Sequence, residues 1–304
     1  MYSFLNLIRW KNLLLIALVQ VLIKYALFEP FYIDTSLDAF TFSILMAATL
    51  FLAAAGNIIN DIYDIETDTV NKPDRVVVGK SISEKVAYNL FFVFNIIGVA
   101  LGFYISHHVG KSPFFALFVL VSASLYIYAS YLKQLPFIGN LIISALVALS
   151  LIIVPIFDLL PAITPFNRAT QITFFKILLD YAFFAFIINL IREMVKDMED
   201  IDGDYKAGMN TIPIAIGRYR AGRIIFLLSI IPLFAVINYV LLYLYKQEVA
   251  VIYFLLFIVA PLIYISIKLF TAKTKKDYTH VSIVLKLVML FGMLSMLLYP
   301  FILK

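Results

Sequence analysis

Nine apolar runs, each about 20 residues long, constrain the fold of this chain more than any other feature of its sequence. About 20 consecutive apolar residues is the length that an α-helix needs to cross the hydrocarbon core of a membrane. No barrel-like alternation of polar and apolar residues appears, and backbone groups inside a membrane need internal partners, so we expect helices. The runs lie near residues 13–28, 39–60, 86–106, 113–132, 138–160, 172–195, 222–245, 249–270 and 281–303.

The composition agrees with a membrane protein that crosses the bilayer many times. Of 304 residues, 63% are hydrophobic and only 14% are charged, and no polar stretch is long enough for a separate soluble domain. We therefore expect an all-α fold with one transmembrane domain over residues 1–304 and nine helices in a single bundle. The chain has no cysteine, which excludes disulfides, thiolate metal sites and cysteine nucleophiles. We expect no cleavable signal peptide, because no small-residue cleavage site follows the first apolar run.

Lysine and arginine predict how the bundle is oriented. They gather at one set of helix ends, in the loops 61–85 and 196–221 among others, and they are sparse at the opposite ends. Positive charge marks cytoplasmic loops, so these loops and the N-terminus are expected in the cytoplasm and the protein in the cell (inner) membrane. The net charge of +5 is explained by bases beside apolar runs, and neither nucleic acid nor an obligate protein partner is expected.

Two acidic motifs stand where apolar runs end on the predicted cytoplasmic side. Asp61, Asp64 and Asp68 are spaced so that one helix would present them on one face, which Asn57 and Asn60 would extend. The same spacing recurs in Asp197, Asp200 and Asp204. The motifs end the second and sixth runs, four helices apart, which predicts two related four-helix halves and a ninth helix.

The chemistry of the two motifs favours a metal and diphosphate site. Acidic residues at membrane segments are costly and usually functional. Mg²⁺ typically takes one or two carboxylates and completes its shell with water and substrate phosphate oxygens. Basic residues that suit phosphate follow each motif or lie beside it. These are Lys72, Arg75, Lys80, Arg192, Lys196 and Lys206.

A short segment after the fourth run adds aromatic and basic groups. Tyr126, Tyr128, Tyr131 and Lys133 close that run, and Asn140 begins the next. An interfacial tyrosine belt with a basic anchor explains them. Alternatively, some of these tyrosines face a cavity, where an aromatic ring stabilises a cation.

These residues together resemble the UbiA-type family of intramembrane prenyltransferases. The first family signature is similar to Asn60-Asp61-x-x-Asp64-x-x-x-Asp68, followed by Asn71-Lys72-Pro73-x-Arg75. The second is similar to Lys196-Asp197-x-x-Asp200-x-x-Gly203-Asp204, and the resemblance covers nearly the whole chain. After Arg75 the chain departs from the family, which often has proline there where this chain has Val76-Val77.

The resemblance implies Mg²⁺-dependent transfer of a prenyl group from a polyprenyl diphosphate to a lipophilic acceptor, with release of diphosphate. It implies a prenyl tunnel open to the bilayer. The metal ligands implied are Asn60, Asp61, Asp64, Asp68, Asp197, Asp200 and Asp204, of which Asp64, Asp68, Asp200 and Asp204 would be catalytic together with Tyr128. The phosphate contacts implied are Lys72, Arg75, Lys133, Arg192, Lys196 and Lys206.

The acceptor is less constrained than the donor. The residues around Gly56-Asn57 and Arg192-Glu193 look most like the family branch of geranylgeranylglyceryl-phosphate geranylgeranyltransferases. That branch implies geranylgeranyl diphosphate as donor and a glycerol-phosphate ether lipid as acceptor. An aromatic quinone precursor such as a hydroxybenzoate, or haem, is an alternative acceptor. An ion-coupled transporter is an alternative of another class, although it would place its acids near the midplane of the membrane.

Overall fold

The computed structural model describes residues 2–302, without the side chain of Arg75. Within these residues, nine helical segments are long and apolar enough to cross a membrane, and no extended strand occurs, so the predicted all-α fold with nine spans is confirmed. The helices that form the spans are α2 (Trp10–Val21), α3 (Ala39–Tyr63), α5 (Glu84–His108), α6 (Phe115–Ser130), α7 (Ile138–Asp158), α8 (Arg168–Lys206), α10 (Arg218–Tyr239), α11 (Glu248–Phe254) with α12 (Ala260–Thr271), and α13 (Lys275–Leu294) with α14 (Tyr299–Ile302).

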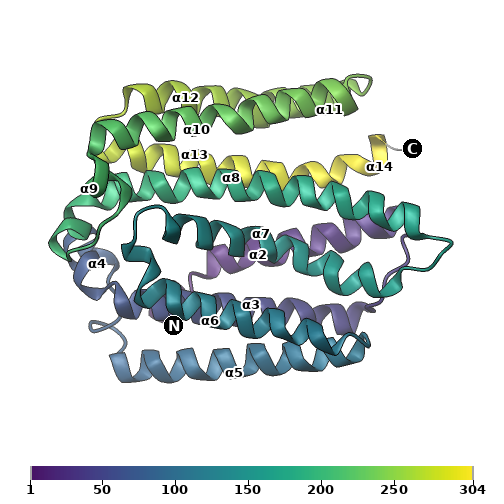
Figure 1. The fold of residues 1–304 in the computed structure, drawn as a ribbon, viewed down its shortest axis with the longest axis horizontal. Coiled ribbons are helices and arrows are strands. Elements are labelled where there is room, and N and C mark those ends of the chain that lie inside the picture. The colour runs from purple at the N-terminus through teal and green to yellow at the C-terminus, as the bar shows by residue number, and fades with distance from the viewer. Residues whose placement is uncertain (1, 303–304) are drawn as a thin grey trace.

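The long helices run side by side in one bundle (Figure 1). Helix α3 packs against α5 and α6, and α10 packs against α12. Helix α8 packs against both α7 and α13, so it joins the two sides of the bundle. The short helices α4 (Ile65–Asn71) and α9 (Ile212–Ile216) lie at one end of the bundle, on the left of Figure 1, where α3 and α8 end with the two acidic motifs.

Glycine allows close packing on one side of the bundle. A Cβ at Gly102 of α5 would lie 2.2 Å from the Phe118 ring of α6, and one at Gly98 would lie 2.8 Å from Leu52 of α3. Small residues let membrane helices approach closely, which gives more van der Waals contact. Phe118 in turn packs edge-on against Phe157 of α7, with ring centroids 5.4 Å apart. These contacts connect the second to the fifth spans into one apolar core.

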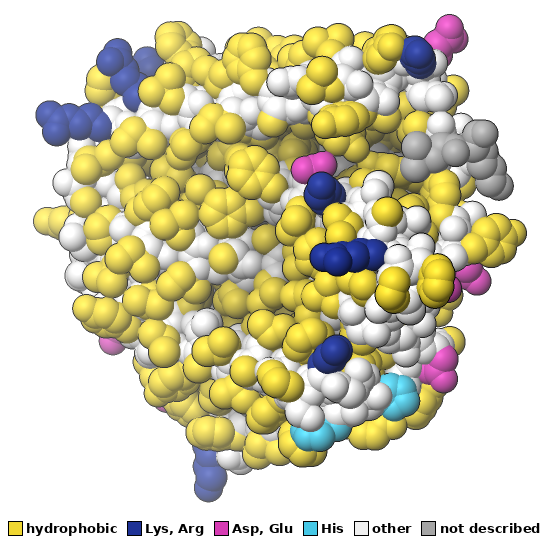
Figure 2. All heavy atoms as spheres, turned by 45° about the vertical axis from the view of Figure 1, so that its right-hand side comes forward, with side chains coloured by type: hydrophobic (Ala, Val, Ile, Leu, Met, Phe, Trp, Pro, Cys, Tyr) yellow, Lys and Arg dark blue, Asp and Glu magenta, His cyan; other side chains and the backbone are white. Residues whose placement is uncertain are grey.

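The surface of the bundle matches a hydrocarbon environment. Hydrophobic side chains cover most of the face shown in Figure 2. Many large ones are exposed on the outer helices, including Phe234 and Leu241 of the α10 span and Ile96 of α5. Exposed apolar area of this extent is unusual for a soluble monomer and is expected for helices in contact with lipid. The chain is therefore a multi-pass membrane protein.

A buried ion pair fixes the first span to the fifth. The first span is longer than predicted, Trp10–Phe31, because α2 begins at Trp10 and a 3₁₀ turn (Glu29–Phe31) follows the π-helical segment Leu22–Phe28. Lys24 lies in that segment, and its Nζ lies 2.9 Å from Asp158 Oδ2 and 2.7 Å from the carbonyl oxygen of Leu37. Asp158 Oδ1 accepts a hydrogen bond from the Leu37 amide at 2.8 Å. The charged lysine is thus accommodated in an apolar run because a carboxylate and a carbonyl meet it there.

Removal of one partner of this pair should destabilise the protein. In Asp158→Asn the ammonium of Lys24 stays buried without its counter-charge, which typically costs about 3–5 kcal/mol. We expect a clearly lower unfolding temperature for purified Asp158→Asn, with Lys111→Ala, an exposed lysine at the same end of the bundle, unchanged. Equal unfolding temperatures for Asp158→Asn and the unmodified protein would contradict a structural role for the pair.

Candidate active site

The first acidic motif lies where α3 passes into α4. The prediction of one continuous helix through Asp61, Asp64 and Asp68 is wrong in detail, because α3 ends at Tyr63 and α4 begins at Ile65, with Asp64 between them. The backbone bonds nevertheless continue, from the Asp64 amide to the Asn60 carbonyl at 2.9 Å and from the Asp68 amide to the Asp64 carbonyl at 2.8 Å. The slight break turns the motif toward α8.

The second acidic motif lies on the last turns of α8, as predicted. This helix continues without interruption to Lys206 and carries Asp197, Asp200 and Asp204. Asp204 is buried, with 8% of its surface exposed, and Asp197 and Asp200 are half-buried. Asp202, on the opposite side, is exposed and pairs with Arg218 at 2.9 Å.

The loop after α4 joins the two motifs. Asn71 Nδ2 donates to the Asp200 carbonyl at 2.8 Å, and Asn71 Oδ1 accepts from the Gly203 amide at 3.0 Å. Lys72 Nζ then lies 2.6 Å from Asp200 Oδ2 and 3.8 Å from Glu199. The first motif is therefore held against the second by residues that directly follow it in the sequence.

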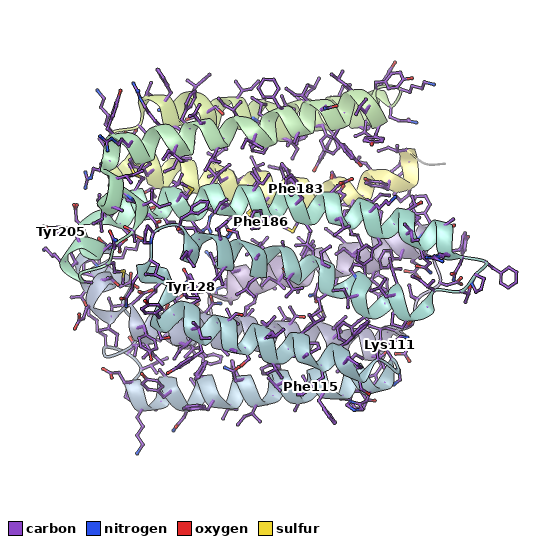
Figure 3. All side chains as sticks on the ribbon, viewed as in Figure 1. Lys111, Phe115, Tyr128, Phe183, Phe186 and Tyr205 are labelled. Carbon is purple, nitrogen blue, oxygen red and sulfur yellow. The ribbon has the colours of Figure 1, made fainter. Side chains whose placement is uncertain are left out.

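The segment between α6 and α7 also contacts both motifs. Lys133 Nζ and Asn60 Nδ2 each donate to a carboxylate oxygen of Asp64. Asn140, at the start of α7, donates from Nδ2 to Asp197 Oδ2 at 2.9 Å. Tyr128 projects from α6 at this end of the bundle (Figure 3) and is half-buried, close enough to Asp64 and Asp197 for their charges to act on it. The segment between α6 and α7 thus lies beside the aspartates of both motifs.

Arg9 is a site residue that sequence reasoning missed. Its Nη2 lies 2.7 Å from Asp61 Oδ1. Arg9 stands between α1 (Tyr2–Leu7) and α2 with a positive φ of 51°, which turns the chain and brings its side chain to α3. In the sequence it is one of many bases near an apolar run, and nothing in its spacing marks it as a partner of an acid 52 residues away.

The carboxylate oxygens of the site suit a hard divalent cation. Among the side chains that the structure describes, which exclude that of Arg75, buried Asp200 Oδ1 has no hydrogen-bond partner, and neither Asp68 nor Asp204 has a side-chain partner. Burial, followed by the neighbouring charge of Asp64, raises the pKa of Asp68 to about 6. In the described part of the chain no three acidic, histidine or cysteine side chains already form a closed metal cage. An open set of oxygen donors is what Mg²⁺ uses when it binds with a phosphate-bearing substrate.

The remaining predicted residues lie in three different places. Arg192 and Lys196 precede the acidic motif on α8 and pair with Glu193, at 3.2 Å and 2.8 Å. Lys206 is exposed at the end of α8. The side chain of Arg75 lies outside what the structure describes. The roles predicted for all these residues stay predictions. Of the predicted phosphate contacts, Lys72 and Lys133 form ion pairs with the aspartates of the two motifs.

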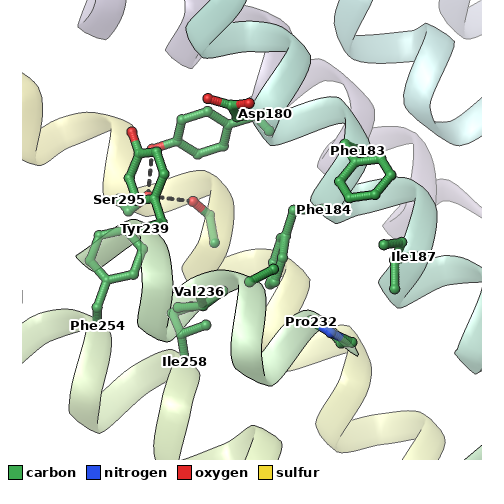
Figure 4. A pocket seen from close by; sticks show the side chains of 13 residues that line it. Asp180, Phe183, Phe184, Ile187, Pro232, Val236, Tyr239, Phe254, Ile258 and Ser295 are labelled. Atoms are coloured by element: carbon green, nitrogen blue, oxygen red, sulfur yellow. Dashed lines mark hydrogen bonds between the residues drawn. The ribbon is translucent and has the colours of Figure 1, made fainter. Parts of the chain in front are cut away.

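A separate apolar cavity of about 160 Å³ lies between α8, α10 and α13 (Figure 4). Phe184, Ile187 and Val236 line it, with Asp180 and the hydrogen-bonded pair Tyr181 and Ser295 at its edge. Asp180 precedes Asp197 by 17 residues of helix, about 25 Å. The cavity is therefore distinct from the polar site, and its lining suits alkyl groups rather than ions.

Comparison with known proteins identifies the family of this chain. The model of the UbiA prenyltransferase family matches residues 17–289. The chain belongs to the UbiA prenyltransferase family. The predicted family is thus confirmed, and the protein is a membrane-embedded prenyltransferase. The chain is 33% identical to the digeranylgeranylglyceryl phosphate synthase of Korarchaeum cryptofilum over 81% of both chains. It is 32% identical to that of Methanococcoides burtonii over 97% of this chain and 98% of the relative.

Solved structures share the fold. A structure described as a digeranylgeranylglyceryl phosphate synthase in membranes has a TM-score of 0.63 and 24% identity, over 97% of this chain and 98% of the other. A UbiA homolog from Archaeoglobus fulgidus bound to GPP and Mg²⁺ has a TM-score of 0.56 and 18% identity, over 97% and 99% of the two chains.

The contact between Gly203 and Asn71 provides a test of how the two motifs are joined. A Cβ at Gly203 would lie 2.3 Å from Asn71 Nδ2, so Gly203→Ala should push the loop and Lys72 away from α8. Because a displacement of about 1 Å can cost about 10²-fold in rate, we expect prenyl transfer to fall by about that factor. Gly222→Ala is the matched control, because a Cβ at Gly222 would lie 3.7 Å from the Tyr278 hydroxyl, an ordinary van der Waals distance. This variant should keep its activity. Equal activity of both variants would show that the contact is dispensable.

Proposed function

We propose that this prenyltransferase moves a geranylgeranyl group from geranylgeranyl diphosphate to geranylgeranylglyceryl phosphate, with Mg²⁺ as cofactor. The free hydroxyl of the acceptor attacks the first carbon of the prenyl group. A new carbon–oxygen ether bond forms, the bond from that carbon to the diphosphate breaks, and the hydroxyl proton is released to solvent. The products are diphosphate and a diether lipid phosphate.

One observation carries the proposal, namely the contact between the two acidic motifs through the Asn71–Lys72 loop. It supports a site to which Asp64 and Asp68 contribute from one motif and Asp200 and Asp204 from the other, so that carboxylates of both motifs would be available to one diphosphate. Mg²⁺ held there by Asp64, Asp68, Asp200 and Asp204 would neutralise charge on the leaving group. Asn60, Asp61 and Asp197 would support these ligands.

Lys72 and Lys133 would contact the diphosphate in addition to pairing with the aspartates. Lys72 and Lys133 hold Asp200 and Asp64 in place, and they lie where phosphate oxygens would meet their ammonium groups. Preorganised positive charge stabilises the charge that develops on a departing diphosphate. Tyr128, at the edge of the same region, would offer its ring to the allylic cation. The apolar surroundings would exclude water, which would otherwise capture that cation.

Several features support the lipid acceptor over the alternatives. The curated relatives in the comparison that align with most of this chain are digeranylgeranylglyceryl phosphate synthases, and such a product requires a lipid phosphate as acceptor. An aromatic acceptor or haem would fit the same diphosphate chemistry and is an outcome of the test below. A transporter is disfavoured, because the acids lie at the helix ends and not near the midplane.

The distribution of Lys and Arg supports an orientation with the active-site loops in the cytoplasm. Lys72, Lys133 and Lys206 lie at the same end of the bundle as both acidic motifs. The positive-inside rule then places this end, and the N-terminus, on the cytoplasmic side of the cell membrane. Both proposed substrates would reach the site with their polar groups at that interface.

Product formation by the purified protein in nanodiscs tests the proposal. The protein is given geranylgeranyl diphosphate, Mg²⁺ and either geranylgeranylglyceryl phosphate or a panel of aromatic acids, with EDTA in parallel. We expect a diether lipid phosphate that EDTA abolishes and Mg²⁺ restores. Transfer to an aromatic acid alone would refute the proposed acceptor, and transfer that persists in EDTA would refute the role of the metal.

Asp64 and Asp200 are predicted to be important for activity, and Asp202 serves as the control. Asp64→Asn and Asp200→Asn each remove a charged ligand at nearly constant volume, so we expect activity to fall by about 10²–10³-fold in variants that still fold. Asp202→Asn alters the same part of α8 but on its exposed side, where 79% of the side chain is accessible, and should retain activity. Comparable losses in all three variants would contradict the assigned roles.

A further inference from the structure

A second group of charges lies beside the aspartates but has the opposite sign. It consists of Lys11 of α2, Arg192 and Lys196 of α8, and Lys286 of α13, which we call the basic cluster. Lys286 Nζ donates to Asn12 Oδ1 of α2 at 2.8 Å, so the first and last spans meet here. Lys11 directly precedes Asn12 on α2, and α13 packs along α8, the helix that carries Arg192. Three helices that are distant in sequence therefore contribute to one site.

The basic cluster carries more positive charge than its surroundings neutralise. In the part of the chain that the structure describes, its ion pairs are made with Glu193 alone, at 3.2 Å from Arg192 and 2.8 Å from Lys196. Arg9, whose charge also reaches Glu193, is paired with Asp61. Two of the four cations thus pair with that single carboxylate.

This excess charge lies within membrane-spanning helices. Lys286 stands 11 residues after the start of α13, about 16 Å along its axis, and is half-buried. Within the described part of the chain, Arg192 Nε is buried and has no hydrogen-bond partner. Charges inside membrane spans are expensive and usually mark a functional site, and a buried donor without a partner costs further free energy. An anion with several oxygens would neutralise the excess positive charge and accept a hydrogen bond from Arg192 Nε.

The position of the cluster separates it from the diphosphate site. Arg192 precedes Asp197 by five residues, about 7.5 Å along α8. A diphosphate bound by metal at the aspartates leaves the basic cluster available to a second anion one or two helical turns away. In a glycerol phosphate only a few bonds separate the phosphate from the free hydroxyl, so a phosphate here would place that hydroxyl near the donor.

We infer that the basic cluster binds the phosphate group of the acceptor lipid, with Arg192 and Lys286 as its central contacts. Glu193 positions Arg192 and Lys196, and Asn12 positions Lys286. The planar donor groups of arginine match phosphate oxygens well, and the lysines add charge. This inference rests on the proposed function, because it assigns a site to the acceptor of that reaction and selects acceptors that carry a phosphate monoester.

Steady-state kinetics with two acceptors test the inference. Lys286→Met keeps the length of the side chain and removes its charge. With geranylgeranylglyceryl phosphate we expect the acceptor KM of Lys286→Met to rise about tenfold or more, while the KM for geranylgeranyl diphosphate stays constant. With geranylgeranylglycerol, which lacks the phosphate, the variant and the unmodified protein should perform alike. Lys286→Arg should restore much of the affinity. Lys276→Met, an exposed lysine on the same helix, is the matched control.

The outcomes separate this inference from the proposed function. If the unmodified protein makes no diether from geranylgeranylglyceryl phosphate, the proposed function fails. If it makes the diether but Lys286→Met raises the donor KM instead, or lowers kcat alone, only the acceptor site is refuted. Lys11→Met, which alters an exposed side chain and should not disturb folding, provides a second test. Its acceptor KM should rise as well, by a smaller factor, and an unchanged acceptor KM in both variants would refute the inference.

Discussion

The structure depends on the pairing of charges at one end of an apolar bundle. Carboxylates at the ends of membrane helices are costly unless an opposite charge or a ligand meets them. Here Asp61, Asp64 and Asp200 meet Arg9, Lys133 and Lys72, which come from three different connecting segments. Two of these pairs hold their connecting segments against the end of α3, and the Lys72–Asp200 pair holds the third against α8. The same contacts that relieve the cost of burial therefore assemble the active site.

In the proposed reaction, helix α8 would separate the two substrates by the sign of its charges. Its last turns carry Asp197, Asp200 and Asp204, and the preceding turns carry Arg192 and Lys196. The acidic part suits a metal-bound diphosphate, and the basic part suits a phosphate without metal. Two lipids with phosphate groups could then bind side by side, because each meets a different kind of partner. The order of charges along one helix would fix which lipid is the donor and which is the acceptor.

The sequence predicts the elements well and the contacts between distant segments poorly. Nine spans and the helical second motif follow from hydropathy and spacing, which are local properties. The break at Asp64 was not predicted, because the spacing of the three aspartates fits a continuous helix. Neither Arg9 nor Lys286 carries a signal that identifies its partner, since each meets it only after the bundle forms.

The most direct test of the account is a structure of the protein with Mn²⁺ in place of Mg²⁺ and a non-hydrolysable analogue of geranylgeranyl diphosphate. Anomalous scattering would locate the metal independently of the ligand. The account predicts Mn²⁺ between one diphosphate and carboxylates of both motifs, with Asp64 or Asp68 on one side and Asp200 or Asp204 on the other. A diphosphate bound instead at Arg192 and Lys286, with no metal at the aspartates, would contradict it.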